Sequence, residues 1–328
     1  MPAGERLRRW PLERTAGPAL MTDHPAFTRP LPADTTLSGF FSALGCFSIW
    51  GLFPVYFKAL SQVPALEVLA HRVLWSIVVL LGLILVQGRL HALFAEFRNR
   101  RRIGFYLLTT LLISANWLLY IWAVQQGRIL EASLGYYINP LVNVMLGVLF
   151  LDECLHPRQL SAVLIATFGV LVLVIGYGVF PWISLALALS FGGYGLLRKK
   201  AGYDATLGLA VETALLAPLA ALLLLTLALS GAGALGMVNR HTDLLLLSAG
   251  LVTVVPLLMF LEAGRRLRLS TVGLIQYLTP TLQFLLAVVV YHEPFTSSHL
   301  LTFGCIWLAL ALYSADVYSR HRQRIRPA

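Results

Sequence analysis

The residues of this chain that could do chemistry begin with a stripe of polar side chains inside an apolar segment. Tyr136, Asn139, Asn143 and Gly147 follow one another at spacings of three, four and four residues. In a helix these positions share one face. Their hydroxyl and amide groups could hydrogen-bond a solute in a cavity, or they could pack one membrane helix against another. The length of the stripe favours a cavity.

The stripe recurs 140 positions later in the chain. The copy carries polar or small residues at the four corresponding positions, namely Gln276, Thr279, Gln283 and Ala287. Tyr277 and Pro280 of the copy match Tyr137 and Pro140. A proline inside a helix removes a backbone hydrogen bond and bends the helix. Two prolines at matched positions predict a pair of hinges, whereas a single one would be explained by a static packing kink.

Charged residues also lie inside apolar segments. Arg72 stands in the run EVLAHRVLW, next to His71. An arginine within a membrane is costly unless it faces a cavity or a partner, so Arg72 is a candidate substrate contact, with snorkelling to the surface as the alternative. Glu67 and His71 are four residues apart and can pair on one helix face. Glu212, at the repeat position of Arg72, could neutralise substrate charge or carry a coupling proton.

A third segment, SANWLLYIWAV, adds aromatic and amide groups. Asn116 and Tyr120 share a helix face, and Trp117 beside them could stack on an aromatic or amphipathic solute. Packing of the core explains these residues equally well. The complete predicted substrate site consists of Arg72, His71, Asn116, Trp117, Tyr120, Tyr136, Asn139, Asn143, Glu212, Gln276, Tyr277 and Gln283.

The elements that must position these residues are membrane helices. The chain has 328 residues, of which 58% are hydrophobic and 12% charged, whereas a soluble protein has roughly 25% charged residues. Apolar runs of about 18 to 23 residues follow one another from Ser38 onward, and each can cross a hydrocarbon core ~30 Å thick. The runs are continuous rather than alternating, which excludes a β-barrel. The predicted fold class is an all-α integral membrane protein.

We predict ten transmembrane helices arranged as two inverted five-helix repeats. The predicted spans are about 38–60, 65–86, 103–125, 130–151, 159–178, 181–198, 207–229, 243–263, 270–291 and 299–318. The predicted divisions are a disordered cytoplasmic extension (1–36), the two repeats (37–178 and 179–319) and a basic cytoplasmic tail (320–328). Most of the 25 Lys and Arg residues then fall on one side, which predicts that both termini are cytoplasmic. Since five is odd, the repeats cross the membrane in opposite directions, as in many transporters.

Other classes of function find little support in the sequence. The net charge of +10 arises from loops on one side of the membrane, so no nucleic-acid partner is predicted. Cys46, Cys154 and Cys305 have no metal-binding spacing, and the chain lacks the HExxH and GxSxG motifs. We therefore predict no enzymatic activity, no cofactor and no metal site.

The motifs HRVLWS, NWLLYIWAV, EASLGYYINPLVNVMLG and QYLTPTLQFLLAV resemble the EamA family of the drug/metabolite transporter superfamily, and within it the RarD branch. The resemblance covers about residues 38–318. It implies a ten-helix secondary transporter of the bacterial inner membrane, often an exporter of small metabolites or drugs. It does not indicate the substrate, the coupling ion or the oligomeric state.

Our first functional hypothesis is therefore alternating-access transport of a small amphipathic or anionic solute, driven by a proton or substrate gradient. The alternative is a membrane scaffold or regulator that transports nothing, whose helices only pack. Gradient-driven flux in proteoliposomes separates the two hypotheses.

Overall fold

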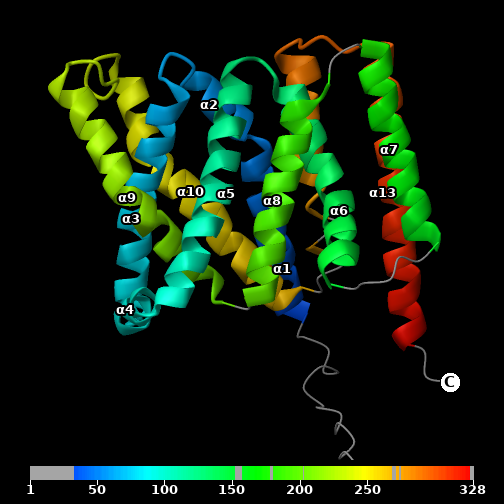
Figure 1. Cartoon of the computed structure of the whole chain (residues 1–328), viewed down its shortest axis with the longest axis horizontal. Coiled ribbons are helices and arrows are strands. Elements are labelled where there is room, and N and C mark those ends of the chain that lie inside the picture. Colours follow the sequence, from blue (N-terminus) through cyan, green and yellow to red (C-terminus); the bar gives the residue numbers. More distant parts are fainter. Residues whose placement is uncertain are drawn as a thin grey trace, which may run out of the picture.

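The structure, a computed structural model, describes residues 33–151, 157–177, 180–201, 203–267, 271–272 and 275–325. The described residues form helices joined by short turns, with no strand among them (Figure 1). Most of the predicted N-terminal extension lies outside the described residues. The predicted cytoplasmic tail is partly helical, because the last helix continues to Ile325.

The helices differ in length and in their ability to cross a membrane. In chain order they are α1 (Ala33–Gly51), α2 (Phe53–Ala59), α3 (Ala65–Val86), α4 (Leu90–Arg98), α5 (Arg100–Gln125), α6 (Ile129–Leu151), α7 (Pro157–Tyr177), α8 (Trp182–Ala201), α9 (Ala205–Leu229), α10 (Arg240–Arg266), α12 (Leu278–Leu285), the π-helix η2 (Leu286–Val290) and α13 (Ser297–Ile325). Within the described ranges, 7 spans are long and apolar enough to cross a bilayer, the first formed jointly by α1 and α2. Three shorter apolar helices, Leu160–Ile175, Trp182–Arg198 and Leu278–Val290, occupy the fifth, sixth and ninth predicted spans. The predicted all-α membrane class is confirmed.

Two of the predicted continuous helices are broken. The first span divides at Leu52 into α1 and α2, because Pro54 stands at the start of α2 and cannot continue the preceding helix. In the ninth span a turn at Gln276 and Tyr277 precedes α12. Pro280 therefore lies in the first turn of α12, where a backbone N–H has no partner within the helix and can be absent without cost. Pro140, in contrast, lies inside α6. The two prolines thus occupy different places in their helices, and their action as a pair of hinges stays a prediction.

The helices of the first half of the chain pack in the same pattern as those of the second half. Each packed pair described next has a counterpart in which the two halves are exchanged. The helix α1 packs on α10 and α12, just as α8 packs on α5 and α6. The helix α3 packs on α10, just as α9 packs on α5. The pairs α3 with α9, α6 with α12, and α7 with α13 pack directly on each other. The start of α1 and the end of α13 lie at the same end of the bundle as α4 (Figure 1).

A close approach of two backbones fixes the position of α3 against α10. A Cβ atom added to Gly250 of α10 would overlap the backbone carbonyl of Trp75 in α3. Only a residue without a side chain fits there, as is common where membrane helices approach closely. This contact positions α3, which carries Arg72.

We expect Gly250→Ala to force α3 and α10 apart and to lower the stability of the protein by about 1–3 kcal/mol, the usual cost of overpacking. Unfolding of the purified protein in detergent measures the change. The control is Gly264→Ala in the same helix, where an added Cβ meets no atom within 4 Å. Equal stability of the two variants would contradict the close approach.

Candidate functional site

The guanidinium group of Arg72 lies at the centre of the candidate site. The side chain is 6% exposed, and its guanidinium carbon lies 4.3 Å from the centroid of the Trp117 ring on α5. Its Nε donates a hydrogen bond to Thr253 Oγ1 of α10 at 2.9 Å. The rings of Phe53 and Phe57 lie within 5.8 Å of the same carbon. No carboxylate in the part of the chain that the structure describes lies within ion-pair distance of Arg72.

Arg72 is thus a buried cation that is held by aromatic faces and one hydroxyl group. A ring face attracts a guanidinium group, more strongly where water is excluded, but it does not neutralise its charge. The arrangement suits a solute that brings a negative group to the guanidinium and an apolar body to the rings.

An aromatic wall continues from Arg72 toward the polar stripe. Tyr120 packs edge-on against Phe57 at 6.0 Å and against Tyr136 at 5.6 Å between ring centroids. The Tyr120 hydroxyl accepts a hydrogen bond from Gln283 Nε2 of α12 at 3.0 Å, and the same Nε2 donates to the carbonyl of Trp50 at 3.2 Å. The structure therefore brings together Arg72, Trp117, Tyr120, Tyr136 and Gln283, five of the predicted site residues.

Two amide oxygens of the predicted site residues have no hydrogen-bond partner among the described residues. They are Oδ1 of Asn139 and Oε1 of Gln283, and both are buried. A buried acceptor without a donor is costly, so each of these oxygens can accept a hydrogen bond from a solute.

The polar stripe of α6 faces several neighbours. Tyr136 packs against Phe191 of α8 as well as against Tyr120. Asn143 is exposed, and a Cβ added to Gly192 of α8 would lie 3.1 Å from its Oδ1. The contact of α6 with α12 uses other side chains: Ser133 Oγ donates to the carbonyl of Pro280 at 2.9 Å, and the hydroxyls of Tyr137 and Thr281 are 2.8 Å apart.

Several predicted site residues have structural partners instead. Asn116 Nδ2 donates to the Leu187 carbonyl at 3.0 Å and to Ser190 Oγ at 2.9 Å, which ties α5 to α8. Gln276 and Tyr277 are half-buried in the turn before α12. The predicted pair of Glu67 and His71 is not formed, because each side chain bonds elsewhere: Trp75 Nε1 donates to His71 Nδ1 at 3.3 Å, and Ala234 N–H donates to Glu67 Oε1 at 2.6 Å.

Glu212 belongs to a second polar cluster, and its partners there do not include Arg72. The residue is 1% exposed. Thr109 Oγ1 donates to its Oε1 at 2.7 Å, and the Tyr194 hydroxyl donates to its Oε2 at 3.1 Å. The guanidinium of Arg198 lies 3.8 Å from Oε1. Gly208 makes room for Arg198, since an added Cβ there would overlap the guanidinium group.

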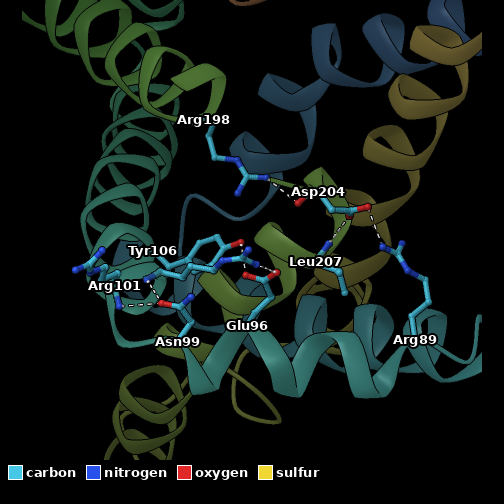
Figure 2. A network of polar contacts seen from close by, with 9 residues as sticks. Arg89, Glu96, Asn99, Arg101, Tyr106, Arg198, Asp204 and Leu207 are labelled. Carbon is cyan, nitrogen blue, oxygen red and sulfur yellow. Dashed lines mark hydrogen bonds and ion pairs between the residues drawn. The ribbon is translucent and has the colours of Figure 1, made fainter. Parts of the chain in front are cut away.

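Arg198 also belongs to a network of polar contacts near α4, which was not predicted from the sequence (Figure 2). Arg198 donates to the Asp204 carbonyl at 3.1 Å, and Arg89 donates to the Asp204 carboxylate at 2.8 Å. Asp204 also caps α9 by accepting the Leu207 N–H at 2.9 Å. Partial burial raises the pKa of Asp204, but the bonds from Leu207 and Arg89 outweigh it and hold the pKa below its usual value. A helix-capping pattern, Asp before an apolar run, was the available sequence signal.

Glu293 caps a helix at the opposite end of the bundle. Its two carboxylate oxygens accept the N–H groups of Ile129 and Leu130 at 2.7 Å each, so a residue that follows η2 caps the start of α6. Burial raises the pKa of Glu293 above its usual value, although these two bonds act in the opposite sense. A cavity of about 380 Å³ adjoins this cap, with Arg128, Glu131, Glu293 and His299 among the residues that line it.

We expect Thr109→Val to destabilise the protein by about 1–3 kcal/mol, because it removes a donor from the buried carboxylate of Glu212. The same change in a Glu212→Gln background should cost less, because the lost bond is then no longer charge-assisted. Denaturant unfolding measures the four proteins of this cycle. The control is Thr226→Val, an exposed hydroxyl bonded within its own helix. Additive effects of the two changes would contradict the bond between Thr109 and Glu212.

Comparisons with known proteins bear on the whole chain. The model of the EamA-like transporter family matches residues 37–175. An "Uncharacterized transporter" of Vibrio cholerae is 46% identical over 278 residues, which cover 85% of this chain and 92% of the relative. A "Protein RarD" of Salmonella typhi is 44% identical over 294 residues, covering 90% of this chain and 100% of the relative. A solved structure described as "Crystal structure of protein" shares the fold at 20% identity and a TM-score of 0.54, covering 85% of this chain and 96% of its own.

Proposed function

Because the chain belongs to the EamA-like transporter family and is related over most of its length to RarD proteins, we propose that it moves a small organic anion by alternating access across the bacterial inner membrane. The family resemblance predicted from the motifs is thereby confirmed, and the chain is a multi-pass membrane protein. Export is the proposed direction, as the resemblance implies.

The observation that carries this proposal is the buried charge of Arg72. A cation within an apolar bundle is stabilised by an anion far more than by ring faces alone. The guanidinium lies on Trp117 and uses its Nε for Thr253, and a carboxylate or phosphate of the solute would pair with its terminal nitrogens. Binding of an anion would neutralise the site and allow the loaded carrier to change conformation.

Further groups define the rest of the proposed solute. Trp117, Tyr120 and Tyr136 offer apolar faces to its body. The unpaired oxygens of Asn139 and Gln283 call for N–H or O–H donors on the solute. The proposed substrate class is therefore an amphipathic organic anion that also carries hydrogen-bond donors.

Alternating access requires two arrangements of the helices, and inverted repeats supply them. The exchange-symmetric packing of α1, α3, α5, α6 and α7 with α8, α9, α10, α12 and α13 supports two five-helix repeats and ten transmembrane helices. The arginine-rich connections near α4 and the basic last turns of α13 support a cytoplasmic location for that end of the bundle and for both termini.

A proton gradient is the proposed energy source, and Glu212 is the proposed proton carrier. Its carboxyl group is buried between Thr109, Tyr194 and Arg198, in the first half of α9, which packs on α4. Protonation would remove the charge that attracts Arg198, so the proton and the position of Arg198 would change together. The same change would loosen the connection of Arg198 to Asp204.

We expect Arg72→Ala to reduce the flux of organic anions in proteoliposomes at least about tenfold, because removal of a charged partner typically costs roughly 1.5–3 kcal/mol or more. Arg72→Lys should give an intermediate flux, because a lysine keeps the charge but loses the planar stacking on Trp117. The matched control is Arg240→Gln, an exposed arginine at the start of α10, which should transport normally. Normal anion flux in Arg72→Ala would contradict the assignment of Arg72 to the substrate site.

We expect Glu212→Gln to abolish uptake driven by a pH gradient and to spare solute exchange in the absence of a gradient. A glutamine cannot release a proton, but its carbonyl oxygen can still accept from one of the hydroxyls of Thr109 and Tyr194 while its amide group donates to the other. Counterflow of labelled solute measures exchange. Retained pH-driven uptake would show that the coupling proton is carried elsewhere.

A further inference from the structure

A cavity separate from the Arg72 site lies between α3, α9 and the connection from α9 to α10. Its volume is about 300 Å³. Most of its lining is apolar and comes from Leu74, Trp75, Leu224, Ala228, Leu235 and Met237. The polar side chains that reach it are Glu67 and His71. It lies at the end of the bundle away from α4, where α9 meets α10 (Figure 1).

The carboxylate of Glu67 is only half satisfied. The residue is 2% exposed. Its Oε1 accepts the Ala234 N–H at 2.6 Å, which anchors the connection between α9 and α10. Its Oε2 is buried and has no hydrogen-bond partner among the described residues. An anchor for a single N–H group needs one oxygen, so the second oxygen is left for another donor.

Among the residues that the structure describes, no cationic side chain forms an ion pair with Glu67. His71 Nδ1 accepts the hydrogen bond of Trp75, so the imidazole carries its proton on Nε2 and is neutral. Arg72 follows next in the chain but points to Trp117 and Thr253. The position of Glu67 in the first turn of α3 stabilises the ionised carboxylate through the helix dipole.

We propose that this cavity binds a protonated amine carried on an apolar body. An ammonium group has three donors and a positive charge, so it would supply the missing bond to Glu67 Oε2 and neutralise the carboxylate. The apolar walls would enclose the hydrocarbon part of the same molecule. Two sources share this chemistry, a free amphipathic amine and the aminoethyl headgroup of a membrane lipid.

The test uses the full chain in nanodiscs of phosphatidylglycerol, with n-octylamine as the probe and n-octanol as its uncharged counterpart. Native mass spectrometry measures probe that stays bound. We expect octylamine to bind and octanol to bind at least about tenfold more weakly. Addition of phosphatidylethanolamine to the nanodiscs separates the two sources. Loss of octylamine binding indicates that the lipid headgroup occupies the site, and unchanged binding indicates a site for free amines.

Two variants and one control make the test specific to the cavity. Glu67→Gln keeps an oxygen for the Ala234 N–H, so the connection stays anchored while the charge is lost; octylamine affinity should fall roughly tenfold to hundredfold. Ala228→Leu fills the cavity and should also weaken binding while leaving the carboxylate intact. Glu262→Gln removes a carboxylate that pairs with Arg266 elsewhere on α10 and should bind octylamine as the unaltered protein does.

Equal octylamine binding by the unaltered protein and by Glu67→Gln would overturn the proposal, since the amine would then only partition into lipid. Equal binding of octanol and octylamine would overturn it as well, because the site would then recognise the apolar chain alone. These outcomes do not depend on transport, so they leave the role of Arg72 to its own test.

Discussion

The cost of burying charge among apolar helices governs this structure. A charged side chain removed from water must find a partner, and this bundle solves the problem differently at each of its buried charges. Glu212 is surrounded by two hydroxyl groups and approached by Arg198. Arg72 has ring faces and one hydroxyl group, and Glu67 has one backbone N–H. The degree of compensation by neighbouring groups thus falls from Glu212 to the two charges of α3, and these are the two charges that we propose bind solutes.

The second constraint is that no backbone group may remain unpaired within a bilayer. The Trp50 carbonyl at the break in the first span lacks an i+4 partner, because Pro54 has no N–H. Polar side chains of other helices donate to this carbonyl and to carbonyls near other helix ends. Thr279 Oγ1 donates to the Phe47 carbonyl and Gln283 Nε2 to the Trp50 carbonyl, both near the end of α1. Ser184 donates in the same way to the Glu131 carbonyl in the first turn of α6. Part of the polar stripe therefore serves the backbone as well as the candidate site.

The two halves of the chain share a packing scheme but differ where the candidate sites lie. Arg72 and Glu212 occupy matched positions of α3 and α9, 140 residues apart, yet they carry opposite charges and lie in different clusters. The helix α6 is continuous through Pro140, whereas its counterpart divides into a turn, α12 and η2. The two halves thus share a packing scheme, while single side chains at matched positions give them different chemistry.

The sequence by itself determined the membrane class, the positions of the long helices and the identity of the buried charges. These properties follow from local composition, since a run of about 20 apolar residues spans a bilayer and a charge within it is conspicuous. The sequence also singled out five residues that meet in the candidate site, because a helix places residues three and four apart on one face. Only the tertiary structure decided which face meets which neighbour. It directed Asn116 to packing on α8, paired Glu212 with Thr109 and Tyr194, and gave His71 and Glu67 different hydrogen-bond partners. The contacts of Asn116 and Glu212 join residues of different helices, up to 103 positions apart, so they depend on the relative rotation and distance of whole helices, which no local pattern encodes.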